Sequence, residues 1–337
     1  MNASPQPSAV SSAADTLAEG VIASRRRALA RAITLIESTR PDHRHEAEEL
    51  MRRILPHSGR SIRLGISGIP GVGKSTFIEA FGKHLIDAGQ RVAVLAVDPS
   101  SPVTGGSILG DKTRMAELAR RPEAFIRPSP SGGTLGGVAR RTRESLLLCE
   151  AAGFDVIIVE TVGVGQSETA VADMVDMFLL LLAPGGGDEL QGIKKGIVEL
   201  ADVIVVNKAD GDLAPAAERA RREYASALHL LSPRSAAWTP GVLKCSSLDQ
   251  TGIAEVWEQV GAFREAKDGS GEFSTRRAEQ ARAWMWSEVR ETLVAELRAS
   301  TERGAVVDAL EARVADGEIS PTEAAHKVIG AFVAQQK

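Results

Sequence analysis

The stretch GIPGVGKST, residues 68–76, has the residue types and the spacing of a loop that binds nucleotide phosphates. It fits the pattern G-x-x-x-x-G-K-[ST], with Gly68, Gly73, Lys74 and Ser75 in the fixed places. Glycines let backbone N–H groups close around an anion, the lysine ammonium reaches the β and γ phosphates, and the serine hydroxyl binds Mg²⁺. We therefore predict that a nucleotide is held by Gly68, Ile69, Pro70, Gly71, Val72, Gly73, Lys74, Ser75 and Thr76.

The tetrapeptide Asn207-Lys208-Ala209-Asp210 indicates which base the site accepts. The Asp210 carboxylate can accept hydrogen bonds from guanine N1–H and the exocyclic amine, and a site built for such donors rejects adenine, which lacks that pair. We expect Lys208 to lay its stem along the base and Asn207 to tie this segment to the phosphate-binding loop. Backbone N–H groups of Cys245-Ser246-Ser247, at the end of an apolar run, are placed to meet guanine O6. The predicted nucleotide is GTP, hydrolysed to GDP, rather than ATP.

Three acidic residues, Asp98, Asp111 and Glu160, lie in loops that follow strand-like apolar segments. An α/β sheet binds its ligands at the loops after the strand ends. Mg²⁺ prefers oxygen ligands and needs only one or two carboxylates beside the phosphates. We therefore predict a Mg²⁺ site made by Ser75 with some or all of these acids, the alternative for each acid being an ordinary solvated loop residue.

No residue of the sequence is an obvious base for the attacking water. Glu160 opens an E-x-x-G segment in the place where many GTPases carry D-x-x-G, and Gln166 lies just beyond that segment, where it could position water. We place Lys74, Glu160 and Gln166 in the catalytic set and expect slow intrinsic turnover. Arg140, Arg141 and Arg143 lie at a predicted helix start. One of them could stabilise phosphate charge, but we favour the alternative, surface salt bridges, because exposed arginines more often form them.

The elements that position these residues are predicted from apolar runs of strand length that alternate with helical patterns. Continuous runs such as VIIV and VIVV suit strands that are covered on both faces, as in a parallel sheet with helices on either side. The expected strands are residues 62–67, 91–97, 124–127, 155–160, 177–183, 203–208 and 242–246. The fold class is therefore an α/β P-loop NTPase with a mainly parallel central sheet.

The sequence divides into four parts. We expect residues 1–13 to be a disordered tip, 14–58 a helical extension with a break near Pro41, 59–265 the GTPase domain, and 275–337 a helical region. Residues 266–274, AKDGSGEFS, have the polar, glycine-rich composition of a linker. The C-terminal helices either pack on their own α/β domain or form a dimer interface; we favour the dimer, because Trp286, Val289, Leu293 and Leu297 form an apolar stripe.

Composition limits the classes of partner and compartment. The formal net charge is −4, and this gives no general attraction to nucleic acid or to anionic membranes. The two cysteines, Cys149 and Cys245, do not suggest a disulfide framework. The longest apolar run is too short to span a bilayer, and residues 1–13 lack the layout of a secretory signal. We expect a cytoplasmic protein that binds neither nucleic acid nor membrane.

The motifs VDPSSP, GGSILGDKTRM, RPSPSGGTLGGVARRT, FDVIIVETVGVGQSE and NKAD, together with GIPGVGKST, resemble the MeaB/ArgK/MMAA group of GTPases over nearly the whole chain. The resemblance implies a homodimeric metallochaperone-type GTPase that binds methylmalonyl-CoA mutase or a related cobalamin-dependent mutase. Such a protein gates the loading and protection of the mutase's adenosylcobalamin, uses Mg²⁺ with GTP or GDP, and is expected to hold no cobalamin tightly itself. Carried over by position, residues 68–76 hold phosphates, Asn207 and Asp210 read guanine, Ser246, Ser247 and Leu248 complete that pocket, and Asp98, Asp111 and Glu160 surround Mg²⁺.

Two rival classes remain beside the GTPase chaperone. A P-loop kinase or transport-linked ATPase would need an acceptor pocket for a small molecule beside the γ-phosphate, and the sequence shows no signature of one. A plain nucleotide-binding scaffold would need neither turnover nor a partner. Phosphate transfer to added acceptors separates kinase from hydrolase, and the protein captured with the chain from its native cell identifies the partner.

Overall fold

The computed structural model describes residues 12–38, 40–97, 115–128, 135–161, 167–185, 195–230, 234–299 and 301–334. The chain forms two compact units, Met1–Ala278 and Glu279–Lys337, which are described separately.

A seven-stranded parallel sheet forms the centre of the first unit, with the strand order β3-β2-β4-β1-β5-β6-β7. All seven predicted strands are present, and their ends differ from the prediction by at most two residues. Every position of β2, β4, β5 and β6 is buried, as expected for strands that helices cover on both faces. The bounds are β1 (Ile62–Gly68), β2 (Val92–Val97), β3 (Ala124–Arg127), β4 (Val156–Thr161), β5 (Met177–Leu182), β6 (Val203–Val206) and β7 (Gly241–Lys244). The predicted α/β fold class is confirmed.

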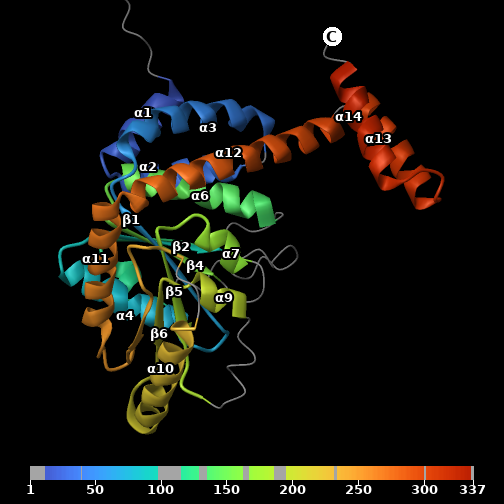
Figure 1. Ribbon diagram of the computed structural model, residues 1–337. Coiled ribbons are helices and arrows are strands. Elements are labelled where there is room, and N and C mark those ends of the chain that lie inside the picture. Colours follow the sequence, from blue (N-terminus) through green and yellow to red (C-terminus); the bar gives the residue numbers. More distant parts are fainter. Residues whose placement is uncertain are drawn as a thin grey trace, which may run out of the picture. The chain divides into compact units, whose positions relative to one another are not determined.

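Helices cover the two faces of the sheet (Figure 1). One face carries α4 (Lys74–Asp87) and α11 (Ile253–Ser270), and the other carries α6 (Leu135–Ala151), α7 (Ser167–Ala172), α9 (Lys195–Leu200) and α10 (Ala214–Leu228). Successive side chains of a strand point to opposite faces, so Val94 packs in the core beneath α4 while Leu95 packs in the core beneath α6. The helix α4 buries one apolar face against the sheet, through Phe77, Ala80, Phe81 and Leu85.

Three N-terminal helices pack against α6 and against one another: α1 (Ala13–Ile22), α2 (Arg26–Glu37) and α3 (Pro41–Ile54). The helix α3 begins at Pro41, where the sequence indicates a break, and Pro is favoured at the first position of a helix. A further break at residues 23–25 was not predicted; there Ser24 has a positive φ of 57°. Ser12 caps α1 in a capping box with Asp15, and residues 1–11 of the expected disordered tip lie outside the described residues.

The expected linker at residues 266–274 is wrong, because this segment is a fixed elbow between two helices. The helix α11 continues to Ser270, Gly271 alone turns the chain with a φ of 75°, and α12 (Glu272–Ala299) begins at the next residue. The buried Lys267 donates from Nζ to Glu272 at 2.6 Å, and that hydrogen bond holds the pKa of Glu272 below its usual range. Ser235 adds a second donor to Glu272 at 2.7 Å. The charges that suggested a solvated linker instead fix the elbow.

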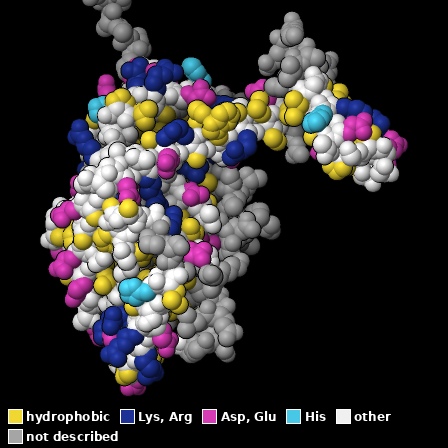
Figure 2. Space-filling model, viewed as in Figure 1, with side chains coloured by type: hydrophobic (Ala, Val, Ile, Leu, Met, Phe, Trp, Pro, Cys, Tyr) yellow, Lys and Arg dark blue, Asp and Glu magenta, His cyan; other side chains and the backbone are white. Residues whose placement is uncertain are grey.

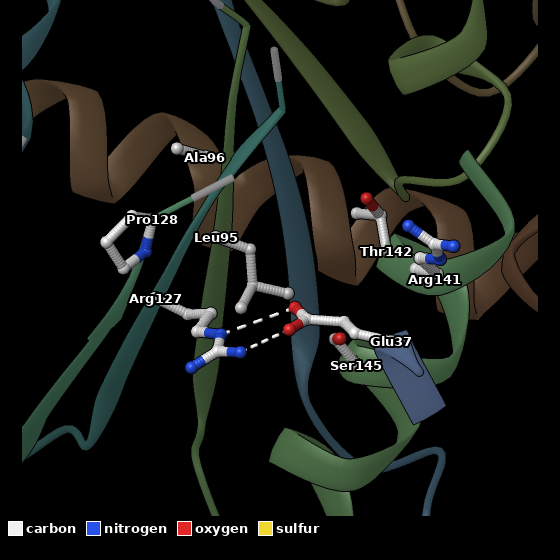
Figure 3. Close-up of a pocket in the computed structure, with 8 residues that line it drawn as sticks. All are labelled: Glu37, Leu95, Ala96, Arg127, Pro128, Arg141, Thr142 and Ser145. Carbon is white, nitrogen blue, oxygen red and sulfur yellow. Dashed lines mark hydrogen bonds and ion pairs between the residues drawn. The ribbon is translucent and has the colours of Figure 1, made fainter. Parts of the chain in front are cut away.

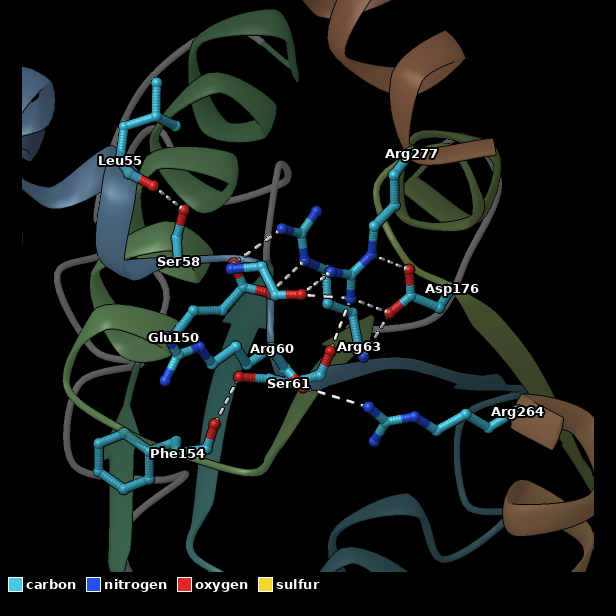
Figure 4. Close-up of polar contacts among 11 residues, drawn as sticks. Leu55, Ser58, Arg60, Ser61, Arg63, Glu150, Phe154, Asp176, Arg264 and Arg277 are labelled. Atoms are coloured by element: carbon cyan, nitrogen blue, oxygen red, sulfur yellow. Dashed lines mark hydrogen bonds and ion pairs between the residues drawn. The ribbon is translucent and has the colours of Figure 1, made fainter. Parts of the chain in front are cut away.

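The first turns of α12 are held to the first unit by arginine (Figure 4). Arg277 donates to both carboxylate oxygens of Asp176, at 2.8 and 2.6 Å, and to the carbonyls of Gly59 and Ser61. Arg276 donates to the carbonyl of Ala172 at the end of α7. The start of α12 therefore belongs to the α/β unit.

The second unit contains the rest of α12, α13 (Thr301–Ala315) and α14 (Pro321–Ala334). Its small core contains Leu310, Ile319 and Ala324. Hydrophobic side chains gather along α12 on the face that Figure 2 shows, and Trp286 and Leu293 are 58% and 43% exposed. In the part of the chain that the structure describes, no helix combines the length and apolar character that crossing a membrane requires.

Candidate functional site

The phosphate-binding loop lies between the end of β1 and the start of α4, at the carboxyl edge of the sheet. Gly71 and Gly73 have φ of 81° and 91°, which glycine adopts without strain. A Cβ at Gly68 would lie 2.6 Å from the carbonyl oxygen of Leu181, and one at Gly73 would lie 2.8 Å from Asn207 Nδ2. Close packing against β5 and the Asn207 segment therefore requires glycine at positions 68 and 73, and the backbone conformation favours it at position 71.

The Lys74 ammonium is folded back over this loop. Its Nζ donates to the carbonyl oxygens of Gly68 at 2.8 Å and Ile69 at 3.4 Å. Lys74 is also the first residue of a 14-residue helix, whose N-terminal N–H groups and dipole favour an anion. These features bring positive charge to the place where the sequence predicts the β and γ phosphates.

Ser75 and Glu160 meet at the ends of α4 and β4. Ser75 Oγ donates to Glu160 Oε1 at 3.3 Å, and Glu160 is buried. A hydroxyl and a carboxylate oxygen side by side are ligands of the type that Mg²⁺ accepts. The other predicted ligands, Asp98 and Asp111, lie outside the described residues, as does Gln166. Among the residues that are described, no group of three histidine, cysteine or acidic side chains forms a metal cluster.

The predicted tie between the base segment and the phosphate-binding loop is present. Asn207 Nδ2 donates to the Val72 carbonyl oxygen at 3.0 Å. Lys208, with a positive φ of 57°, donates from Nζ to the Gly71 carbonyl at 2.8 Å, so its stem crosses to the same loop. The phosphate segment and the base segment, more than 130 residues apart in sequence, thus form one site.

The last segment of the site, Ser246 to Leu248, follows β7. Ser246 Oγ donates to Asp210 Oδ2 and thereby orients the carboxylate that is predicted to read guanine. Ser247 is buried and donates from both its N–H and its hydroxyl to Asn207 Oδ1, at 3.2 and 2.7 Å. Leu248 is 74% exposed. The sequence indicated the N–H groups of this segment but gave no sign of the Ser247 hydroxyl contact, because it joins two loops.

The geometry combines a phosphate-binding loop, two Mg²⁺-type oxygens and a carboxylate at the base segment. A family model described as "Methylmalonyl Co-A mutase-associated GTPase MeaB" matches residues 29–302. The chain belongs to the MeaB family. The predicted resemblance is thereby confirmed.

Relatives of this MeaB-family chain are named as GTPases or after methylmalonic aciduria. A putative GTPase of Caulobacter vibrioides is 57% identical, covering 94% of this chain and 97% of that protein. The GTPase ArgK of Escherichia coli is 53% identical (85% of this chain, 88% of that protein), and the mouse mitochondrial methylmalonic aciduria type A homolog is 49% identical (94% and 79%). A crystal structure of a protein named LAO/AO transport system kinase is 41% identical with a TM-score of 0.75, covering 95% of this chain and 97% of that one. The chain is a GTPase with a guanine nucleotide site.

The three arginines weighed as phosphate contacts, Arg140, Arg141 and Arg143, all lie on α6. Arg140 lies 3.7 Å from Glu144 one turn later, an ordinary helix-surface pair. Arg141 lines a small recess between α6 and the ends of β2 and β3, where Glu37 and Arg127 form an ion pair (Figure 3). The recess has a volume of about 10 Å³, which is room for about one water molecule.

Proposed function

We propose that this MeaB-family GTPase serves methylmalonyl-CoA mutase or a related adenosylcobalamin-dependent mutase, gating the loading of the cofactor and protecting the mutase from inactivation. The observation that carries the nucleotide part is the hydrogen bond from Asn207 Nδ2 to the Val72 carbonyl at 3.0 Å, which joins the base segment to the phosphate-binding loop. The mutase part is supported by the description of the family and by the name of the mouse relative.

The roles of the site residues follow from their chemistry. Residues 68–76 hold the phosphates, Asp210 reads guanine, and Ser75 with Glu160 holds Mg²⁺, joined by Asp98 and Asp111. Mg²⁺ would neutralise charge on the phosphates as they separate. Lys74 stabilises the same charge, and Gln166 positions the water. A site without a strong general base gives slow basal hydrolysis, which suits a protein whose rate its partner controls.

The same proposal includes a homodimer formed through the C-terminal helices. Its support is the exposed apolar stripe on α12, where Trp286 is 58% and Leu293 43% exposed. Trp286→Asp together with Leu293→Asp in the full chain should give a monomer that still binds GDP. Sedimentation measures this; a dimer that survives both changes contradicts the interface. Cutting the chain at residue 275 is a poorer test, because it also removes Arg277 and its ion pair with Asp176.

We place the protein in the cytoplasm with no tightly bound cobalamin of its own and no nucleic-acid or membrane partner. Both cysteines are unpaired and buried, which accords with a reducing compartment.

The deciding experiment measures GTP hydrolysis by the intact chain alone, with purified cofactor-free mutase, and with cofactor-loaded mutase. We expect the mutase to raise the rate of hydrolysis, and the affinities for nucleotide and for mutase to be coupled by roughly 5–150-fold, the usual range for two linked binding sites. Transfer of adenosylcobalamin from a donor enzyme to the mutase should respond to the change from GDP to GTP. An unchanged rate together with transfer that ignores the nucleotide would overturn the proposal.

A kinase acting on a small molecule is the second candidate, favoured by the kinase name of the 41% identical crystal structure. GTP labelled at the γ-phosphate distinguishes the two. The hydrolase releases all label as inorganic phosphate whether or not candidate acceptors such as basic amino acids are added. Label found on an acceptor would replace the chaperone proposal with the kinase.

A further inference from the structure

The side-chain amide of Asn207 lies between two loops, and its two ends have different partners. Nδ2 donates to the Val72 carbonyl at 3.0 Å, while Oδ1 accepts from the Ser247 hydroxyl at 2.7 Å and the Ser247 N–H at 3.2 Å. Only 1% of Asn207 is exposed. An amide has one accepting and one donating end, so the donors on Oδ1 determine that the donating end faces the phosphate-binding loop.

The Ser247 hydroxyl is the strongest of the side-chain donors that reach Oδ1. Cys245 Sγ also lies 3.5 Å from this oxygen, but a thiol is a weak donor. Burial raises the pKa of Cys245 to about 12, so the thiol stays protonated and neutral. The third donor, the Ser247 N–H, belongs to the backbone that the sequence assigns to guanine O6.

The sequence predicts that this N–H also meets guanine O6, in which case guanine and Asn207 would compete for it. When guanine O6 accepts from the Ser247 N–H, the hydrogen bond from this N–H to Asn207 Oδ1 lengthens. The Ser247 hydroxyl then remains as the strong donor to Asn207 Oδ1. We infer that Ser247 is a positioning residue that couples the base to the phosphate-binding loop: its hydroxyl keeps Asn207 oriented toward Val72 while its N–H serves guanine. This inference concerns the GTP site itself and holds whichever mutase is the partner.

The packing around Gly73 shows that the orientation of Asn207 affects the loop. A Cβ at Gly73 would come within 2.8 Å of Asn207 Nδ2, so the amide and the loop backbone are already in close contact. A rotated Asn207 would leave the Val72 carbonyl without this donor and present an oxygen to it instead. The loop would then hold phosphate less well, although Ser247 touches no phosphate.

The test compares a ligand that has a base with one that has none. Ser247→Ala removes the hydroxyl and keeps the N–H; binding of GDP and of inorganic tripolyphosphate, each with Mg²⁺, is measured by calorimetry. We expect the GDP affinity to fall about tenfold and that for tripolyphosphate less than about threefold, because without a base the N–H still holds Asn207. The apparent melting temperature of the nucleotide-free protein should change little for the same reason.

A second variant supplies the missing donor from the other side of Asn207. Cys245→Ser in the Ser247→Ala background puts a hydroxyl where the thiol lies 3.5 Å from Oδ1, and it should restore at least part of the GDP affinity. Ser247→Thr keeps the hydroxyl and should bind GDP nearly as the unaltered protein does, which covers the case in which the alanine variant folds poorly. Ser58→Ala is the matched control, since that exposed hydroxyl donates to the Leu55 carbonyl ahead of β1, at the opposite end of this strand from the phosphate-binding loop.

Equal losses for GDP and tripolyphosphate would reduce Ser247 to a structural residue and overturn the coupling. Unchanged GDP affinity in Ser247→Ala would overturn it as well, because the hydroxyl would then have no role in orienting Asn207. Selective loss of GDP affinity, partly recovered by Cys245→Ser, would establish it.

Discussion

The two edges of the central sheet place charge in opposite ways. At the amino edge, where the strands begin, arginines and carboxylates are buried against one another. At the carboxyl edge, where the strands end, Lys74 donates to backbone carbonyls of the phosphate-binding loop, and Ser75 donates to the Glu160 carboxylate, a group of the type that binds Mg²⁺. Both edges are rich in polar groups, but the first buries pairs of opposite charge beside the start of α12, whereas the second gathers Lys74, Ser75 and Glu160 around the predicted phosphate and metal positions.

The amino edge shows how complete this pairing is (Figure 4). Arg63 binds Glu150 through two hydrogen bonds of 2.9 Å, and the Glu150 side chain is fully buried. Asp176 accepts from Arg277 and from the Arg63 N–H, with 2% of its side chain exposed. Such paired carboxylates are costly to separate and have little capacity for a ligand. The amino edge therefore holds the fold and the start of α12, while the carboxyl edge carries the chemistry.

The largest effect on stability is expected from Arg277→Ala. The change leaves the buried Asp176 carboxylate without its main partner, and breaking a buried pair in this way costs about 3–5 kcal/mol of unfolding free energy. Urea unfolding of the intact chain measures the loss, and the GDP affinity of the protein that stays folded should be almost unaltered. Arg264→Ala is the control, because Arg264 is half exposed and its change should alter stability by no more than about 0.5 kcal/mol.

If Arg277→Ala weakened GDP binding as much as it weakened the fold, the two edges would be coupled and the comparison would fail. If Arg277→Ala and Arg264→Ala lowered the unfolding free energy equally little, the ion pair of Arg277 with Asp176 would not be what holds the start of α12.

Lys74→Ala should produce the reverse pattern. Removal of the ammonium that faces the phosphates should lower GTP hydrolysis by roughly 100–1,000-fold, the usual cost of losing one charge-stabilising group. The unfolding free energy should stay within about 0.5 kcal/mol, because Lys74 is at a helix start and is only partly buried. Lys83→Ala serves as the comparison on the same helix, since Lys83 pairs with Glu117 on the surface and should keep full activity. Turnover that survives in a folded Lys74→Ala protein would remove the lysine from the site.

The sequence alone predicts the strands and the nucleotide motifs, because local residue patterns determine them. Apolar runs predicted all seven strands, and VIIV and VIVV lie in β4 and β6, whose positions are all buried, as expected for strands that helices cover on both faces. GIPGVGKST follows the predicted strand 62–67, and the base motif predicts the contact of Asn207 with the phosphate-binding loop. These features depend on residues whose neighbours in sequence are also their neighbours in space, or on a motif that implies a partner.

Contacts between distant residues without a motif could not be predicted. Arg277 and Asp176 are 101 residues apart, and Ser247 and Asn207 are 40 apart, so neither pair leaves a periodic trace. The glycines and charges of residues 266–274 predict a linker, whereas the structure fixes Glu272 through Lys267 and Ser235. A charged, glycine-rich composition predicts a solvated linker, but it does not reveal whether the charged side chains have partners elsewhere in the fold.

The smallest effect is expected at Asp202, which also lies at the amino edge but differs from Asp176. Its Oδ2 accepts the Phe178 N–H at 2.8 Å, and burial raises the pKa of this carboxyl, although Arg276, Arg234 and Lys267 oppose the rise. A carboxyl whose pKa is higher in the folded than in the unfolded state binds more protons when folded. Burial of the Asp202 carboxyl therefore lowers the unfolding free energy as the pH rises above the pKa that this group has in the unfolded chain. Below that pKa the carboxyl is neutral in both states, and the loss disappears.

Asp202→Asn should thus stabilise the protein at pH 7.5 by roughly 0.5–1 kcal/mol, because the amide oxygen still accepts from Phe178 without carrying a charge. The gain should be smaller at pH 4.5, where the unaltered carboxyl is closer to its neutral form; urea unfolding at both pH values measures it. Asp176→Asn is the matched change at a paired carboxylate and should be destabilising at pH 7.5, since it weakens the bond to Arg277. Opposite signs at these two positions would show that the pairing of each carboxylate, and not its place at the amino edge, determines what it contributes. If Asp202→Asn were also destabilising at pH 7.5, the three nearby cations would outweigh burial, and the whole amino edge would act as one ion-pair network.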